Sequence, residues 1–324
     1  MPHRLATVTF PHARVLLART KLAYVHLRNL LTDAKRDRMA RVFGYVAIWM
    51  PEEMILLYLQ EGELVNATSH DGMTTMVLPI AAALERVPSG PEYGEICFHE
   101  ADDEQLACMF ATHAWEPEPW PPELDPRDLT AVVSYLMATT YDGMLEIEAD
   151  GRVGYVVLRN GAPTRAFVGG DGPTEPAPDL MSLLAPGGRA AARVRRWPVP
   201  PPLPVQAPPG LIQAYRELTW ALVASLEAAG KEGAGPLAEH ARRALVGAHP
   251  VLDGFRIGEG MVHDPVADTE TLTAGVAAWV TGILWACGDL QGTSPEVLLR
   301  DLTRDRRHML QSAGFFERLP WTVQ

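Results

Sequence analysis

The chain contains two stretches that align without a gap, GYVAIWMPEEMILLYLQEGELVNAT at residues 44–68 and GMLEIEADGRVGYVVLRNGAPTRAF at residues 143–167. The second stretch begins 99 residues after the first, and the turn residues coincide under this shift. A fixed internal shift indicates one structural unit used twice. The identical positions are Gly44 and Gly143, Ile48 and Ile147, Leu59 and Leu158, Gly62 and Gly161, and Ala67 and Ala166.

Each copy predicts a three-stranded antiparallel meander. Glu61-Gly62 lies opposite Asn160-Gly161, and Asn-Gly is a strong hairpin signal because both residues tolerate a positive φ. In the second copy, apolar Leu145 and Ile147 alternate with glutamates, the pattern of a half-buried strand. Pro163 predicts an edge position or an early strand end, because proline cannot donate to a central ladder.

The elements around the two meanders follow the same order. Each meander is preceded by a predicted helix and followed by another helix and a strand. The predicted helices cover residues 26–34, 128–140, 76–86 and 179–184, and the predicted strands cover residues 95–99 and 191–197.

The C-terminal segment differs from both copies. Apolar residues spaced by three and four predict amphipathic helices at residues 211–229, 236–247, 269–290 and 295–313, with one short strand at 255–257. Proline-rich connectors at 116–126 and 198–209 separate the parts. We therefore expect an α+β protein with two tandem modules at 1–115 and 125–198, followed by an all-α domain at 210–324.

The repeated module resembles the PATAN-like family, small domains of bacterial signalling and gliding-motility proteins. The resemblance lies in a helix followed by alternating apolar positions, a turn, an apolar strand and a final glycine and alanine. It implies a protein-interaction role without known catalysis. The residues that carry it are Gly44, Val46, Ile48, Leu59, Glu61, Gly62, Leu64, Val65, Asn66 and Ala67 in copy one, and Gly143, Leu145, Ile147, Leu158, Arg159, Asn160, Gly161 and Ala166 in copy two.

Composition excludes several classes of protein. The net charge of -12 disfavours nucleic-acid binding, which rewards clustered Lys and Arg. Three scattered cysteines predict buried thiols rather than a disulfide framework. The first residues lack the pattern of a secretory signal, and no long uncharged apolar run predicts a membrane span. We expect a cytoplasmic protein.

No motif predicts a catalytic, cofactor or metal site. His70-Asp71-Gly72 is interpreted as a turn, HEADDE at 99–104 as a solvated acidic turn, and His263-Asp264 as a loop. Gly169-Gly170-Asp171-Gly172 lacks the Lys-Ser/Thr of a phosphate-binding loop. We therefore assign no catalytic residue, no cofactor and no metal.

Two groups of residues are candidates for contact with a partner. Arg193, Arg195 and Arg196 form a basic cluster before the second connector. Phe315, Phe316 and Trp321 lie beyond the last long helix and either fold back on the domain or dock on a partner. The other large aromatics of the C-terminal segment, Trp220, Trp279 and Trp285, are interpreted as core.

Three functional hypotheses follow. The first is a non-enzymatic adaptor of bacterial signalling or motility, which binds other proteins or a second copy of itself. The second is a small-ligand receptor or enzyme, with a site in the helical domain or in the cleft between the modules. The third is nucleic-acid binding through the arginine clusters at residues 193–196 and 300–307, which the acidic composition disfavours.

Overall fold

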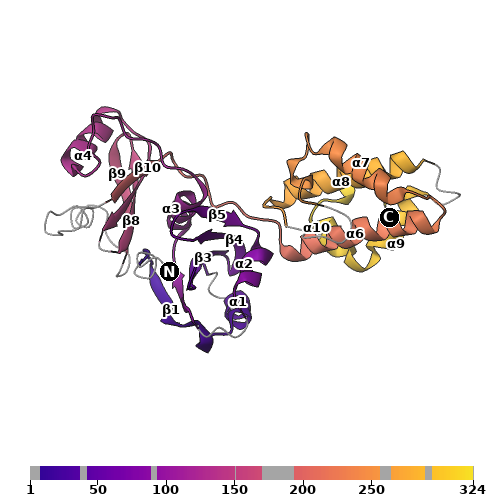
Figure 1. The fold of residues 1–324 in the computed structure, drawn as a ribbon, viewed down its shortest axis with the longest axis horizontal. Coiled ribbons are helices and arrows are strands. Elements are labelled where there is room, and N and C mark those ends of the chain that lie inside the picture. The colour runs from indigo at the N-terminus through magenta and orange to yellow at the C-terminus, as the bar shows by residue number, and fades with distance from the viewer. Residues whose placement is uncertain are drawn as a thin grey trace. The chain divides into compact units, whose positions relative to one another are not determined.

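The computed structural model describes residues 8–36, 42–88, 93–149, 151–169, 193–255, 264–288 and 294–323. It divides the chain into two compact units. The first holds Met1–Leu78 with Glu85–Pro204, and the second holds Pro79–Leu84 with Val205–Gln324. Both copies of the repeat belong to the first unit, which carries the sheets, and the long C-terminal helices belong to the second (Figure 1).

Module one is built on a six-stranded antiparallel sheet with the order β1-β6-β2-β3-β4-β5. The meander predicted from the sequence forms β2, β3 and β4, and β6 pairs back on β2. The strands are β1 (Arg14–Lys21), β2 (Gly44–Trp49), β3 (Met54–Gln60), β4 (Glu63–His70), β5 (Thr75–Leu78) and β6 (Glu95–Glu100).

Module two repeats the central part of this sheet. Its four strands have the order β10-β7-β8-β9, so the last strand again pairs with the first strand of the meander. The strands are β7 (Gly143–Ala149), β8 (Arg152–Arg159), β9 (Ala162–Val168) and β10 (Arg193–Trp197). Pro163 lies in β9, an edge strand of this sheet, as predicted. The α+β class with two tandem meanders and a helical C-terminal part is confirmed.

Two equivalent glycines occupy the same tightly packed hairpin turn in both copies of the repeat. Gly62 and Gly161 follow Glu61 and Asn160 in the hairpin turns, and all four residues have positive φ. A Cβ at Gly62 would lie 2.4 Å from the carbonyl oxygen of Ala34, and one at Gly161 would lie 2.4 Å from that of Leu136. Both oxygens belong to the helix that precedes the meander, so the same turn is packed against the same element in both copies.

Helix α3 (Asp103–Ala114) was not predicted and lies at the centre of the first unit. Asp102 caps it by accepting a hydrogen bond from the Gln105 N–H, so the acidic run interpreted as a solvated turn is a helix start. Residues 105–113 are all buried, as expected of a helix covered on every side. It contacts β4 and β5 of module one and β8 of module two, and Figure 1 shows it beside β5.

The two faces of the module-two sheet are both covered. One face packs under α4 (Leu129–Ala138), with Leu145, Ile147 and Val194 in that core. The opposite face, with Met144, Tyr155 and Trp197, joins the core of module one. The prediction that β7 is half-buried was therefore wrong, because the face that bears Glu146 is turned toward module one and not to water.

The helices that flank the sheets correct one prediction. Residues 76–86 do not form one helix, since β5 ends at Leu78 and Pro79 precedes the helix α2 (Ile80–Arg86). Module one begins its repeat with α1 (Leu27–Arg36), after a short 3-10 turn at Leu22–Tyr24. The predicted helix at 179–184 and the glycines at 170 and 172 lie outside the described residues.

The second unit is a helical bundle around one apolar core. The helix predicted at 295–313 is interrupted by a 3-10 turn, and Phe255 lies in the core outside any strand, with 256 and 257 not described. Its elements are α6 (Pro209–Ala228), α7 (Ala234–Leu245), η3 (Pro250–Leu252), α8 (Thr269–Cys287), α9 (Pro295–Thr303), η4 (Arg304–Arg306), α10 (Arg307–Ser312) and η5 (Phe316–Arg318).

Helix α8 is long and apolar enough to cross a membrane by length and composition alone. Within the unit, 61% of that stretch is buried, and Trp279 at its centre is fully buried. Buried core helices have the same length and composition, so these two properties do not assign α8 to a membrane.

Candidate ligand-binding site

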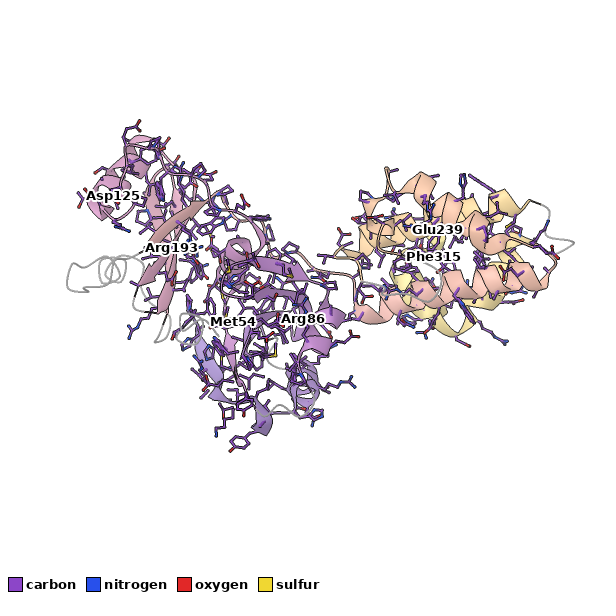
Figure 2. The ribbon with its side chains drawn as sticks, viewed as in Figure 1. Met54, Arg86, Asp125, Arg193, Glu239 and Phe315 are labelled. Atoms are coloured by element: carbon purple, nitrogen blue, oxygen red, sulfur yellow. The ribbon has the colours of Figure 1, made fainter. Side chains whose placement is uncertain are left out.

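A pocket of about 580 Å³ lies between the two modules, inside the first unit. Met54 of β3 and Arg193 of β10 line it from the two modules, and both are labelled in Figure 2. We call it the inter-module pocket. Its polar lining residues are His70, Thr74, Thr75, Thr112, His113, Glu116, Glu146, Glu148, Arg193 and Arg195.

Strand register places four charged residues on the pocket side of module two. Arg195 of β10 lies opposite Glu146 of β7, and Arg193 lies opposite Glu148. Because side chains alternate along a strand, these two pairs share one face. The Arg195 guanidinium forms an ion pair with Glu146, whose side chain is only 6% exposed.

The Glu146–Arg195 pair is buried without complete hydrogen bonding. Burial raises the pKa of Glu146, and the Arg195 charge opposes that rise. Among the atoms that the structure describes, Glu146 Oε2 and Arg195 Nε have no hydrogen bond of good geometry. Such atoms are costly in a dry interior, and each retains capacity for a further polar partner.

His70 reaches the pocket from the end of β4. The predicted turn is present, because the Asp71 carboxylate accepts hydrogen bonds from the N–H groups of Met73 and Thr74. These bonds lower the pKa of Asp71 to about 2. The same turn directs the Gly72 N–H onto His70 Nδ1 at 2.7 Å, so the turn fixes the imidazole ring as well.

His113 reaches the pocket from the C-terminal turn of α3. Its Nδ1 lies 2.7 Å from the carbonyl oxygen of Met109, one helical turn earlier. Burial lowers the pKa of His113 to about 4. The rings of His70 and His113 are 6.2 Å apart and close to perpendicular, and the Arg195 charge lowers the pKa of both. The two histidines and the ion pair therefore form one electrostatic group.

The arginine cluster predicted from the sequence is divided by strand alternation. Arg193 and Arg195 face the inter-module pocket. Arg196 points to the other side of β10, where its guanidinium lies 5.0 Å from the Trp120 ring and 5.3 Å from the Tyr141 ring. Its Nη2 donates to the carbonyl oxygen of Pro119 at 2.7 Å, so Arg196 holds the connector against module two.

The aromatic tail folds back on the helical unit. Phe315 is fully buried, with its ring 5.6 Å from that of Tyr215, so it offers no surface to a partner in this conformation. Phe316 is partly buried beneath the Arg307 guanidinium. Trp321 is partly buried, with its ring 6.4 Å from Trp285.

The exposed aromatic residues of the helical unit differ from those that the sequence predicted to be available to a partner. Trp279 is buried, as expected for a core residue, but Trp220 is 63% exposed and Trp285 is 68% exposed. Helical spacing alone cannot tell which stripe of a helix meets its neighbours. Trp285 borders an apolar groove of about 590 Å³ lined by α7, α8 and residues 318–320.

Metal chemistry has no support in the part of the chain that the structure describes, where no three His, Cys, Asp or Glu side chains gather into a possible ligand set. The cysteines are unpaired with one another and buried, as predicted. Burial raises the pKa of Cys97 to about 12 and that of Cys108 beyond its usual range, so neither thiol is poised as a nucleophile.

Sequence reasoning assigned no binding role to the pocket residues His113 and Glu146 and interpreted His70 only as part of a turn. The one available signal was Glu146 and Glu148 at alternate positions of an otherwise apolar strand. Comparison of the chain with protein-family models finds no match. Comparisons with curated proteins and with solved structures find no match either.

Proposed function

We propose that this protein is a receptor for a small polar molecule, which binds in the inter-module pocket. The observation that carries the proposal is a difference between equivalent positions of the two modules. Glu146 and its partner Arg195 correspond to Ala47 and its partner Cys97 in module one. The same sheet position is charged where it borders the pocket and apolar in the other copy.

The fold does not require charge at this position. Ala47 and Cys97 are 0% and 1% exposed in module one, and the ladder there is continuous. A buried ion pair is often no more stabilising than an apolar pair of similar volume, because removing two charges from water is costly. The presence of Glu146 and Arg195 where the other copy has Ala47 and Cys97 therefore favours a role in binding.

The protonation chemistry favours binding over catalysis. A general base works best with a pKa near the operating pH, whereas the pKa of His113 is about 4. The Thr112 hydroxyl lies 3.2 Å from His113 Nδ1, but that nitrogen is also held by the Met109 carbonyl. No activated hydroxyl results from this arrangement.

A receptor of this kind fits the resemblance of both modules to the PATAN-like family. In that setting, the ligand would act as an input to a bacterial signalling or motility system, and a partner protein would take up the output.

A ligand-observed NMR screen of the full-length chain against small polar compounds tests the proposal. Ala114→Phe places a ring in the pocket, since Ala114 lines it. Ala131→Phe is the matched control, because Ala131 is also a partly buried helical alanine but does not line the pocket. We expect compounds that bind the wild type and the control but not Ala114→Phe. No binding compound, or hits that persist in Ala114→Phe, would exclude the receptor.

The adaptor is the second candidate, and the exposed Trp220 and Trp285 of the helical unit favour it. Exposed tryptophans are enriched where proteins bind one another. Light scattering of the purified chain, with Trp220→Ser/Trp285→Ser as the comparison, tests the self-association form of this function. A dimer that dissociates in the double variant supports it, and a monomer in both excludes that form.

A further inference from the structure

The two histidines of the inter-module pocket have opposite hydrogen-bonding roles. His70 Nδ1 accepts the Gly72 N–H, so in the neutral ring the proton is on Nε2. His113 Nδ1 faces a carbonyl oxygen, which can only accept, so its proton is on Nδ1 and Nε2 carries a lone pair. The nitrogens left for a ligand are a donor on His70 and an acceptor on His113.

Both rings stay neutral at neutral pH. Burial lowers the pKa of His70 below its ordinary value, and burial together with the His70 and Arg195 charges lowers that of His113 to about 4. Neither Nε2 atom has a hydrogen bond to another residue in the described part of the chain. Both histidines line the pocket, which makes this donor and this acceptor the candidates for contact with a molecule there.

The charges around the pocket do not select an anion. Arg193 and Arg195 face their cross-strand partners Glu148 and Glu146, and Glu116 adds a further negative charge to the lining. At Arg195 a phosphate or a carboxylate would have to compete with Glu146, which already forms an ion pair with it, and three glutamates line the pocket against two arginines. An uncharged ligand meets no such competition.

The remaining walls are apolar and partly aromatic. Phe10 and Trp197 are buried there, Trp115 is partly exposed, and Met54 closes the module-one side. Flat rings pack well against aromatic and thioether surfaces. A pocket of about 580 Å³ is within the range that holds a small organic ligand.

We propose that the ligand is an uncharged ring amide, of the kind found in free nucleobases and nucleosides. This inference rests on the receptor function proposed above and names the ligand class of the same site. A ring amide carries a carbonyl oxygen beside an N–H. The oxygen accepts from His70 Nε2, the N–H donates to His113 Nε2, a further polar group of the ligand meets the Glu146–Arg195 pair, whose Oε2 and Nε atoms lack a hydrogen bond of good geometry, and the ring packs against the apolar walls.

Isothermal titration of the full-length chain with uracil, hypoxanthine, uridine and inosine tests this class. 1,3-Dimethyluracil is the matched control compound, because it keeps the ring and carbonyls of uracil and loses both N–H donors. Uridine monophosphate adds only a charged phosphate to uridine. We expect at least one of the four amides to bind, 1,3-dimethyluracil to bind at least tenfold more weakly than uracil, and the monophosphate to bind more weakly than uridine.

The histidine variants locate the binding. His70→Phe and His113→Phe keep a flat ring but remove the donor and the acceptor, and each should weaken amide binding at least tenfold. His99→Phe is the control, since His99 is a histidine of the same module that does not line the pocket. His70 is only partly buried, so its variant remains informative if His113→Phe does not fold.

The outcomes separate the two proposals. If other compounds bind in a manner blocked by Ala114→Phe while none of the four amides binds, the ligand class is wrong and the receptor stands. Amide binding that His70→Phe and His113→Phe leave unchanged also overturns the ligand class. If nothing in the wider screen binds either, both proposals fail.

Discussion

The two modules share one strand order and differ in what their equivalent faces carry. In module one, β2 and β6 present Ala47 and Cys97 to the shared core. In module two, β7 and β10 present Glu146 and Arg195 from the equivalent positions. The hairpin turns with Gly62 and Gly161 are the same in both copies, whereas this face is apolar in module one and charged in module two. Features common to both copies are therefore those the fold needs, and the charged face of module two needs another explanation.

The two modules contribute different kinds of side chain to the inter-module pocket. Module one supplies the neutral histidines, and the second copy, residues 125–198, contains no histidine in its sequence. Module two supplies the buried charge. Neither module alone has both, which is why the site lies where the two meet.

Replacing the glycine of a shared hairpin turn should cause the largest loss of stability. Gly161→Ala places a Cβ 2.4 Å from the Leu136 carbonyl oxygen at a positive φ, so strain and overlap should lower the free energy of unfolding by ~4 kcal/mol. Gly62→Ala should behave alike in module one. Urea unfolding of both variants measures this.

Gly233→Ala is the control for the glycine variants, because Gly233 has φ +87 but no neighbour within 4 Å of its added Cβ. It should cost about 1 kcal/mol, the backbone contribution alone. If Gly161→Ala costs no more than Gly233→Ala, the turn is not packed on the helix as described.

The histidines predict a pH dependence that originates in module one. His113 has a pKa of about 4 in the folded chain and an ordinary value of 6.5 when unfolded. As the pH falls, the unfolded chain therefore takes up a proton at a higher pH than the folded chain does. The free energy of unfolding should decrease by ~3 kcal/mol between pH 6.5 and pH 4. Urea unfolding at several pH values should show a shallower loss in His113→Phe. An identical pH profile would contradict the buried neutral ring.

Breaking the Glu146–Arg195 ion pair should cause a smaller loss of stability. Glu146→Ala leaves the Arg195 charge without its partner, but the Arg195 side chain is 28% exposed and can turn toward water. We expect a loss of about 2 kcal/mol, less than for a fully buried pair. Ala47→Gly, at the equivalent position of module one, removes no charge and provides the comparison. Equal losses measured by urea unfolding would mean that the charge of Glu146 is immaterial.

The smallest effect concerns the surface contact between the modules. Arg165 of β9 forms ion pairs with Asp102 and Glu104 at the start of α3. These side chains are 33–48% exposed, so solvent screens the attraction. Arg165→Met should lower the free energy of unfolding by no more than about 0.5 kcal/mol. The matching decrease in melting temperature should be small and should vanish in high salt. A large salt-independent loss would show that the contact is part of the core.

The repeat itself could be predicted from sequence because its turns depend on local chemistry. Asn and Gly tolerate positive φ, so residue type indicates the turn at Asn160-Gly161, and the alignment places Glu61-Gly62 at the same point of module one. Strand alternation also separated Leu145 and Ile147 from Glu146 correctly. What covers the second face is a tertiary property, and nothing local indicates that α3 and module one bury it.

The pocket could not be predicted for a related reason. His70 and His113 are distant in the sequence and meet only because α3 packs across β4. The same limit applies to the tryptophans of the helical unit. Trp220 and Trp279 both lie in helices predicted to be amphipathic, and the arrangement of α6 and α8 leaves the first exposed and buries the second.

The most direct test of the account is the double variant Glu146→Ala/Arg195→Cys, which gives module two the residues that module one has at these positions. Its unfolding free energy and its titration with the strongest binder among uracil, hypoxanthine, uridine and inosine are measured on the full-length chain. The account predicts a folded protein within about 1 kcal/mol of the wild type and a loss of binding of at least tenfold. Unchanged binding, or a first unit that no longer folds, would contradict the claim that this charge is kept for the ligand and not for the fold.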